Sequence, residues 1–294
     1  MFDLVIAVDW SAASSPGPPR PSPNRAWTAW GTRQDRPAPI YHRTRSSAIE
    51  QLTGLLASHR GTALVGFDFA FGYPTLDGGR SVLPVGRELC RMFGERLEDD
   101  ANDRNNRFEV AAELNAQLAK SLGTPGPFWG RPAGHDDPRL PATKPKGSAI
   151  GDHRAAERYL HARGHRPQSA WKLAYAGSVG SQVITGLAAV HRLMTAPGLA
   201  DRCRLWPFET DWSRDLGGGS TIVIAEIYPS LADHAAVDHP ILDARQVVAQ
   251  RDEILDANDP EELLAAPHDA TGEEIKTAQR AEGWILHPRR LAER

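Results

Sequence analysis

TALVGFDFAFGYP, residues 62 to 74, is the stretch that decides the fold. Its apolar residues run almost without a break, as in a strand that is buried on both faces of a sheet. Asp68 nevertheless lies in the middle of this run, where an ionised carboxylate is costly to bury. The stretch therefore predicts a central strand of an α/β sheet, with a carboxylate whose position calls for a chemical reason.

The segments before this strand predict an antiparallel start to the sheet. Three of them have strand-like patterns and are separated by turn residues: 4–12, 26–32 and 38–45. Residues 46–59 carry the apolar stripe of a helix, with Ser46 or Ser47 as the expected N-cap. Since this helix leads into the buried strand at 62–71, we expect antiparallel pairing at the start of the sheet and parallel pairing at its centre.

The segments after the strand predict the rest of the sheet and its helical layers. Residues 73–168 are rich in Pro, Gly, Arg and Asn, and we expect a large helical and loop insertion over the sheet edge, with one helix at about 106–121. A helix, two strands and two helices follow in this order: 177–194, 203–209, 220–230, 241–256 and 260–282. This is the chain order of an α/β ribonuclease-H-like mixed sheet with helices on both faces, in a single domain over residues 1–294.

The composition is that of a globular protein without a membrane segment. The chain has 294 residues, of which 40% are hydrophobic, and no run approaches the roughly 18 apolar residues that span a bilayer. The N-terminus lacks the basic start of a signal peptide, so we expect a cytoplasmic location. Cys90 and Cys203 lie far apart without further ligands nearby, which indicates reduced thiols.

The charge distribution bears on the choice of partner. A net charge of -3 counts mildly against binding of a polyanion by the molecule as a whole. Residues 131–166, however, hold eight Arg and Lys residues against four Asp and Glu residues, an excess of four positive charges. This segment predicts either a surface for a phosphorylated ligand or an ordinary solvated surface.

Acidic residues recur near the C-terminal ends of the strand-like segments. Asp9, Asp68 and Glu226 each follow a run of apolar residues, and ligands collect at these strand ends in α/β sheets. Clustered carboxylates stay ionised when a cation lies between them, so the three predict a divalent-metal site. Asp269, at the start of a later helix, is a fourth candidate, with helix capping as its alternative role.

The type of ligand predicts the type of chemistry. Ligands that are all oxygen favour Mg²⁺ or Mn²⁺ over zinc. Two such ions promote attack of water on a phosphodiester, with the carboxylates as ligands. The sequence therefore predicts a metal-dependent hydrolase, of nuclease or phosphodiesterase type, with four residues as metal-binding and catalytic: Asp9, Asp68, Glu226 and Asp269.

Polar residues elsewhere are candidates for substrate binding. The helix start GSVGSQ (177–182) can present backbone N–H groups to an anion, although close packing of this helix on the sheet explains its small residues equally well. RNNRFE (104–109) places two arginines before a helix, either in a substrate-binding loop or at a solvated helix start. The candidates are Ser11, Arg104, Arg107, Lys172, Ser178 and Gln182.

The chain resembles the domain of unknown function 429 family of predicted ribonuclease-H-like nucleases. The resemblance lies in VDWSA (8–12), VGFDFAFGYP (65–74), SAWKLAYAGSVGSQVITG (169–186), WPFE (206–209), AEIYPS (225–230), and HDATGEE with EGWILHP near the C-terminus. It implies a single ribonuclease-H-like domain, a metal-dependent nuclease activity, and a site that contains Asp9, Asp68, Glu226 and Asp269. The helix that begins near Asp269 departs from the family pattern because it is more polar.

Two other classes of function remain open. An actin-like ATP-dependent phosphotransferase has a similar sheet, and DWSAAS (9–14) would be its phosphate loop, but that loop lacks the usual glycine. A non-catalytic ligand-binding or scaffold protein would keep the fold without turnover. The partner predicted by the leading hypothesis is a nucleic acid or a phosphorylated small molecule, with no membrane; the sequence does not determine the oligomeric state.

Overall fold

The computed structural model describes residues 2–175, 177–213, 215–216, 219–257 and 262–286, so Ala176 and residues 287–288 of the quoted motifs lie outside the described residues. One mixed six-stranded sheet has the order β3-β2-β1-β4-β6-β5. The strands are β1 (Leu4–Asp9), β2 (Ala26–Gly31), β3 (Ile40–His42), β4 (Ala63–Phe67), β5 (Cys203–Leu205) and β6 (Ile222–Glu226). Pairing is antiparallel from β1 to β3 and parallel among β1, β4, β6 and β5. The predicted antiparallel start and parallel centre are confirmed.

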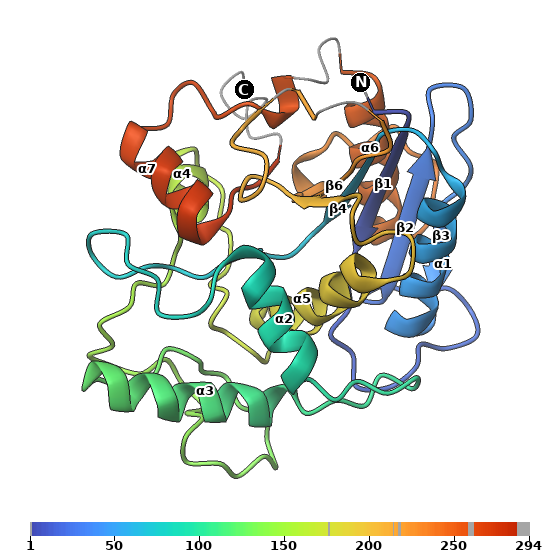
Figure 1. The fold of residues 1–294 in the computed structure, drawn as a ribbon. Helices are drawn as coiled ribbons and strands as arrows, with labels where there is room; N and C mark the ends of the chain where they lie inside the picture. The colour runs from blue at the N-terminus through green and yellow to red at the C-terminus, as the bar shows by residue number, and fades with distance from the viewer. Residues whose placement is uncertain (1, 176, 214, 217–218, 258–261, 287–294) are drawn as a thin grey trace.

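Helices cover both faces of this sheet (Figure 1). They are α1 (Arg45–Ser58), α2 (Gly86–Arg96), α3 (Arg107–Leu122), α4 (Ala155–Ala162), α5 (Gly180–Thr195), α6 (Leu242–Leu255) and α7 (Gly272–Thr277), with short helical turns at Pro229–Leu231, Glu262–Leu264 and Ala278–Glu282. The chain is thus an α/β protein with the predicted helices on both sides of the sheet. None of the helices in the described part of the chain is long and apolar enough to cross a membrane.

Side chains of the central strands alternate between two hydrophobic layers. Ile6 and Val8 of β1 pack with α1 and α5 on one face of the sheet. Val5 and Ala7 pack with α6 on the other face. β4 is in parallel register with β1 and alternates in the same way. This alternation decides which face receives the acidic side chains at the strand ends.

The segment 73–168, predicted as an insertion over the sheet edge, contains three helices and contributes side chains to the hydrophobic core. It contains α2 and α4 as well as the predicted helix near 106–121, which the structure places at α3. Leu89, Cys90 and Phe93 of α2 are buried in the same core as α5, beside which α2 lies in Figure 1. The prediction missed α2 because five of the eleven residues in its sequence, GRELCRMFGER, are charged and its apolar stripe is short.

Two local predictions require correction. The N-cap of α1 is Thr44, whose side chain accepts a hydrogen bond from the Ser47 N–H group, and not Ser46 or Ser47. The long helix predicted over 260–282 is instead a turn at Glu262–Leu264 followed by α7, and its first two residues lie outside the described residues. Pro267 explains the break, because proline disrupts the interior of a helix.

The small residues at the start of α5 allow the helix to pack closely. A Cβ atom at Gly180 would lie 2.4 Å from the Ala170 carbonyl oxygen, and one at Gly186 would lie 2.3 Å from ring atoms of Phe69. Close packing is therefore one reason for the glycines in GSVGSQVITG.

We predict opposite effects for two glycine-to-alanine substitutions in helices. Gly186→Ala should lower the free energy of unfolding by about 1–3 kcal/mol, because the added methyl group overlaps Phe69. Gly54→Ala, in α1 with open space around it, should raise the same quantity by about 0.5–1 kcal/mol through helix propensity. Chemical denaturation measures both, and stabilisation by Gly186→Ala would contradict the close approach.

Candidate functional site

The structure brings Asp9 and Asp68 together at the C-terminal ends of β1 and β4. Val8 and Phe67 are register partners, and the Asp68 N–H group donates to the Val8 carbonyl oxygen at 3.2 Å. Since Val8 and Phe67 both pack in the layer of α1 and α5, the residue after each belongs to the α6 face. The two carboxylates therefore share one row and one face of the sheet.

Burial and mutual repulsion act on this pair. Burial raises the pKa of Asp68 to about 7, although its carboxylate accepts a hydrogen bond from the Trp10 N–H group at 2.7 Å. Burial raises the pKa of Asp9 well above its usual range, and the negative charges of Asp68 and Asp243 add to this effect. The Asp9 carboxylate makes no hydrogen bond or ion pair with the residues that the structure describes. Among the residues that the structure describes, no cation pairs with Asp9 or Asp68, and their raised pKa values favour retention of a proton on the pair.

Asp243 is a third acidic residue at this position that the sequence analysis missed. It lies in the first turn of α6, and its carboxylate accepts a hydrogen bond from the Asn24 N–H group at 2.6 Å. Its only signal in the sequence was an acid near a helix start, a common arrangement that stabilises the helix dipole. Nothing local indicates that α6 places this turn beside Asp9.

The three carboxylates line a cavity of about 730 Å³ at the edge of the sheet. This volume lies within the range of roughly 300–1,000 Å³ that is usual for small-molecule sites. The loop after β1, the start of α3 and the start of α5 complete the wall, through residues that include Trp10, Ser14, Arg107, Phe108, Ser178, Ser181 and Gln182. A ligand in this cavity would therefore contact acids from the ends of β1 and β4 and from α6 on one side, and the starts of α3 and α5 on the other.

Four of the six predicted substrate-binding residues line this cavity: Ser11, Arg107, Ser178 and Gln182. The Gln182 side chain donates to the Trp10 carbonyl oxygen at 2.6 Å, which connects α5 to the loop after β1. These four residues therefore include candidates for ligand binding and, in Gln182, a residue that holds the cavity wall together.

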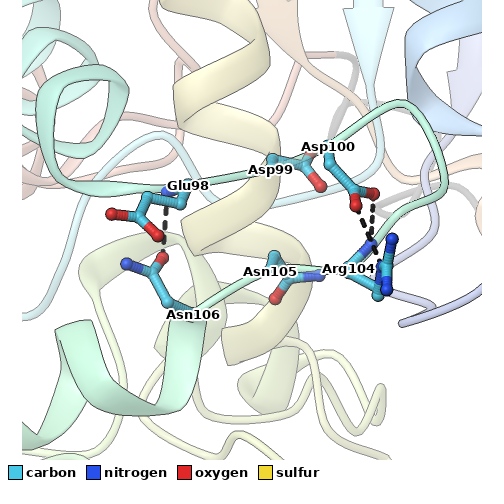
Figure 2. Close-up of a pocket in the computed structure, with 6 residues that line it drawn as sticks. All are labelled: Glu98, Asp99, Asp100, Arg104, Asn105 and Asn106. Atoms are coloured by element: carbon cyan, nitrogen blue, oxygen red, sulfur yellow. Dashed lines mark hydrogen bonds and ion pairs between the residues drawn. The ribbon is translucent and has the colours of Figure 1, made fainter.

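The other two predicted residues, Lys172 and Arg104, lie outside the cavity. The Lys172 ammonium group is 5.5 Å from the centre of the Trp129 ring. Arg104 lines a separate pocket, in which it pairs with Asp100 (Figure 2). The structure therefore does not bring these two residues to the cavity of Asp9 and Asp68, and a sequence motif does not show which side of a loop faces the sheet edge.

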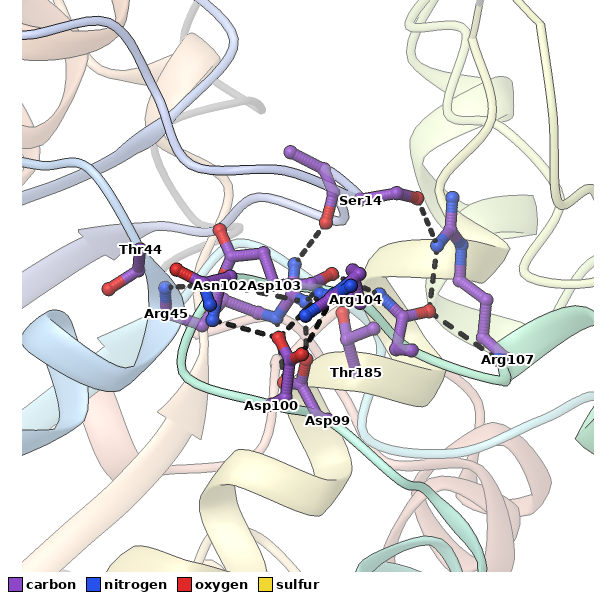
Figure 3. Close-up of polar contacts among 12 residues, drawn as sticks. Ser14, Thr44, Arg45, Asp99, Asp100, Asn102, Asp103, Arg104, Arg107 and Thr185 are labelled. Atoms are coloured by element: carbon purple, nitrogen blue, oxygen red, sulfur yellow. Dashed lines mark hydrogen bonds and ion pairs between the residues drawn. The ribbon is translucent and has the colours of Figure 1, made fainter.

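Arg45 holds the loop after β1 in place (Figure 3). Its guanidinium group pairs with Asp99 at 2.5 Å and donates to the carbonyl oxygens of Ser11, at 3.1 Å, and Ala13, at 2.7 Å. Arg45 is fully buried, and Asp99 balances its charge. The loop that lines the cavity is thus fixed by a buried, neutralised network.

Glu226 does not join Asp9 and Asp68 as a free carboxylate. It is the register partner of Phe67, so its side chain belongs to the face opposite to Asp68. Arg154 donates to both of its oxygens, at 2.6 Å and 2.8 Å. The charge of Glu226 raises the pKa of Asp68, but its own carboxylate is already paired. The predicted grouping of Glu226 with Asp9 and Asp68 is therefore corrected: Glu226 is level with Phe67, one residue before Asp68, and so lies on the other face of the sheet.

Asp269 also lies elsewhere. Its carboxylate accepts a hydrogen bond from the Tyr159 hydroxyl group at 2.8 Å and forms an ion pair with Arg163. Arg163 in turn stacks on the Tyr159 ring, 3.5 Å from its centre. Asp269 therefore connects the C-terminal region to α4 and is not among the residues that line the cavity.

The positive charge of segment 131–166 is largely neutralised within the chain. Five of its eight basic residues form these ion pairs: Arg131 with Asp136, Arg139 with Asp137, Lys144 with Asp152, Arg154 with Glu157 and Glu226, and Arg163 with Asp269. The segment is better described as a set of structural ion pairs than as a surface for anions.

The donor set suits a hard cation with few protein ligands. Within the described ranges, no group of three or more His, Cys, Asp or Glu side chains is arranged to hold a metal ion. Mg²⁺ commonly binds through one or two carboxylates together with water and substrate phosphates. Asp9, which is unpaired, and Asp68, which has one hydrogen bond, fit this mode.

Comparisons of the chain with protein-family models, with curated protein sequences and with solved structures found no match.

We predict that the buried Arg154 network carries a large part of the stability. Arg154→Met should lower the free energy of unfolding by about 3–5 kcal/mol, because Glu226 and Glu157 would be left buried without a cation. Arg158→Met changes an exposed arginine on the same helix and should have an effect below about 0.5 kcal/mol. Equal effects of the two substitutions in urea denaturation would contradict the assignment.

We predict that the Asp68 carboxylate destabilises the metal-free protein at neutral and alkaline pH. Its pKa is about 7 in the folded state, against about 3.9 in an unfolded chain, so the folded state retains a proton that the unfolded state releases between these values. The free energy of unfolding should therefore fall as the pH rises from about 4 to 7. Asp68→Asn keeps an acceptor for Trp10 and should stabilise the protein by roughly 1–3 kcal/mol at pH 8, with little effect at pH 4.

The measurement is chemical denaturation in the presence of EDTA at several pH values. Asp100→Asn is the control, because Asp100 is exposed and its hydrogen bonds with Arg104 and Asn102 hold its pKa below the usual range despite some desolvation. A gain in stability at pH 8 for Asp100→Asn, or none for Asp68→Asn, would contradict the prediction.

Proposed function

We propose that the chain is a divalent-metal-dependent phosphodiester hydrolase that acts on a nucleic acid or a nucleotide-like substrate in the cavity at the ends of β1 and β4. The observation that carries this proposal is the pair of neighbouring carboxylates, Asp9 and Asp68. Burial raises the pKa values of both, and no cationic side chain in the described part of the chain pairs with them. Perturbed acids in a cavity are a physical sign of a functional site.

Asp9 and Asp68 would hold Mg²⁺ or Mn²⁺, which agrees with their all-oxygen character. The ion supplies Lewis acidity toward a phosphoryl oxygen and lowers the pKa of water. Asp68 is oriented for this role by its hydrogen bond from the Trp10 N–H group. Asp243 adds negative charge to the same region and is itself fixed by Asn24.

The balance of charge in the cavity supports a metal as part of the site. Three carboxylates and one guanidinium group line the cavity, so a phosphate near Asp9 would be repelled by the protein alone. A cation between carboxylates and phosphate turns this repulsion into attraction. Without an anionic substrate, it is hard to explain why helix starts and Arg107 line the same cavity.

The other function classes find less support. An actin-like phosphotransferase needs two domains with a nucleotide between them, and the strands of the described residues belong to one sheet. A scaffold without catalysis would have no need for a repelling pair of buried acids, which costs stability. The resemblance to ribonuclease-H-like nucleases agrees with the order of strands, and we retain it as part of the proposal.

The test is an assay with Mg²⁺ or Mn²⁺ on single-stranded DNA, RNA, branched DNA and dinucleotides. Asp9→Asn and Asp68→Asn should each lower the rate by at least about 100-fold, because each removes a charge from the metal site. Asp243→Asn should lower it by about 10–100-fold, as expected of a supporting residue. Asp269→Asn should leave the rate within about 2-fold, because its carboxylate is bound to Arg163 and Tyr159.

Two outcomes would contradict the proposal. One is hydrolysis that continues undiminished in EDTA or in the Asp9→Asn and Asp68→Asn variants. The other is a loss of activity in Asp269→Asn equal to that in Asp68→Asn, which would favour the site predicted from sequence alone.

A further inference from the structure

The part of the cavity wall away from the sheet is formed by two helix starts. α3 contributes Arg107 and Phe108, and α5 contributes Ser181 and Gln182. Neither N-cap residue, Asn106 or Val179, caps its helix with its side chain. The Arg107 N–H group donates to Asn105 Oδ1 at 3.4 Å, and the Gly180 N–H group donates to the Lys172 carbonyl oxygen. The positive ends of two helices of 16 residues each therefore meet at one cavity, which favours a negative group there.

Arg107 is a buried cation on this wall, and none of its hydrogen-bond partners among the described residues is an acid. Its residue is 8% exposed. Nη1 donates to Ser14 Oγ at 2.9 Å (Figure 3). Nε donates to Ser181 Oγ at 2.9 Å, and Nη1 also donates to Asn105 Oδ1 at 2.7 Å. All three partners are neutral, and Nη2 makes no hydrogen bond with the residues that the structure describes.

The other buried arginines each pair with an acid. Arg45 pairs with Asp99, Arg154 pairs with Glu157 and Glu226, and Arg251 pairs with Asp252. Burial, and then the charge of Arg45, lower the pKa of Arg107 to about 10, so it still carries its charge at neutral pH. The guanidinium group lies over the Phe108 ring, 4.3 Å from its centre, which offsets part of the cost of burying the charge. An anion beside it would offset more of this cost.

We propose that Arg107 binds a phosphate group of the substrate other than the one that is hydrolysed, so that the substrate is a nucleotide or short single strand with at least two phosphates. This inference rests on the proposed function, because Asp9 and Asp68 are assigned to the scissile phosphate. Ser14, Asn105 and Ser181 fix the guanidinium plane, which leaves Nη2 for the ligand.

Tyr175 provides a second, independent observation that points to a nucleotide. It lines the same cavity and is 61% exposed, an unusual exposure for a large aromatic side chain. Its hydroxyl group donates to the Arg131 carbonyl oxygen at 3.2 Å, and its backbone has a positive φ of 71°. An exposed ring whose far end is held by a hydrogen bond is a suitable surface for stacking a base.

The space around Tyr175 accommodates more than one nucleotide. Tyr175 and Pro132 also line a neighbouring pocket of about 350 Å³, which contains Arg131 and His135. The two cavities thus share a wall, and a strand bound at Arg107 has room to continue past Tyr175. This continuity favours a short single strand over a mononucleotide.

The test is binding without turnover. A fluorescently labelled, 5′-phosphorylated thymidine dinucleotide is titrated in EDTA against the full chain carrying Asp9→Asn and Asp68→Asn, which removes hydrolysis and the repelling charges. Adding Arg107→Gln should weaken binding by about 10-fold or more, and Arg107→Lys by about 5-fold, because lysine keeps the charge but not the planar fork. Tyr175→Ala should weaken binding by at least about 5-fold.

Controls separate this site from general attraction. Arg91→Gln removes an exposed arginine that is paired with Glu88 and Glu95, and it should leave binding within about 2-fold. Inorganic phosphate should compete only weakly, and the dinucleotide should bind more tightly than a mononucleotide. Unchanged binding in Arg107→Gln, or equal losses in Arg91→Gln and Arg107→Gln, would overturn the proposal. If Arg107→Gln fails to fold, as judged by circular dichroism, Arg107→Lys and Tyr175→Ala decide the question, and unchanged binding in both would overturn it.

Failure of this inference is distinguishable from failure of the proposed function. Metal-dependent hydrolysis by the wild type with an unchanged KM in Arg107→Gln would overturn the inference and leave the hydrolase intact. Binding that depends on Arg107, without any metal-dependent hydrolysis, would overturn the hydrolase and leave an anion-binding cavity.

Discussion

The repulsion between two neighbouring carboxylates at the ends of parallel strands is the interaction on which the site depends. Asp9 and Asp68 follow register partners, so the sheet fixes them side by side, and burial opposes the ionisation of both. A fold that only needed stability would place apolar residues at these positions. The structure instead keeps the pair and, through Trp10 and Asn24, fixes the carboxylates of Asp68 and Asp243.

The rest of the molecule can be understood from that edge of the sheet. The sheet supplies two acids, α6 supplies a third, and α3 and α5 direct their N-termini into the same cavity. Arg45 and Arg154 lie outside that cavity and neutralise their own carboxylates, so they serve the fold. Arg107 has only neutral partners, and this contrast with the other buried arginines marks it as a residue for a ligand.

Sequence patterns were sufficient for the sheet and for part of the site. Continuous apolar runs identified the central strands, and their order required Asp9 and Asp68 to end at the same edge. Glu226 ends a neighbouring strand too, but a register offset of one residue turns it to the other face, and no pattern within one strand reveals its offset from the next. Asp243, and not the predicted Asp269, lines the cavity for a similar reason. The packing of a helix on the sheet, which its sequence does not show, decides which acid lies near the sheet edge. For Arg107, the RNNRFE motif indicated the residue, but only the structure distinguishes it from Arg104.

Binding of Mn²⁺ measured by isothermal titration calorimetry at pH 7, in two buffers of different ionisation enthalpy, tests the central claim most directly. The account predicts one binding site, release of about one proton on binding, since the raised pKa values keep a proton on the pair, and loss of both in Asp68→Asn. Two results would contradict this account. One is Mn²⁺ binding that releases no proton and is retained in both Asp9→Asn and Asp68→Asn. The other is the absence of Mn²⁺ binding by the wild type.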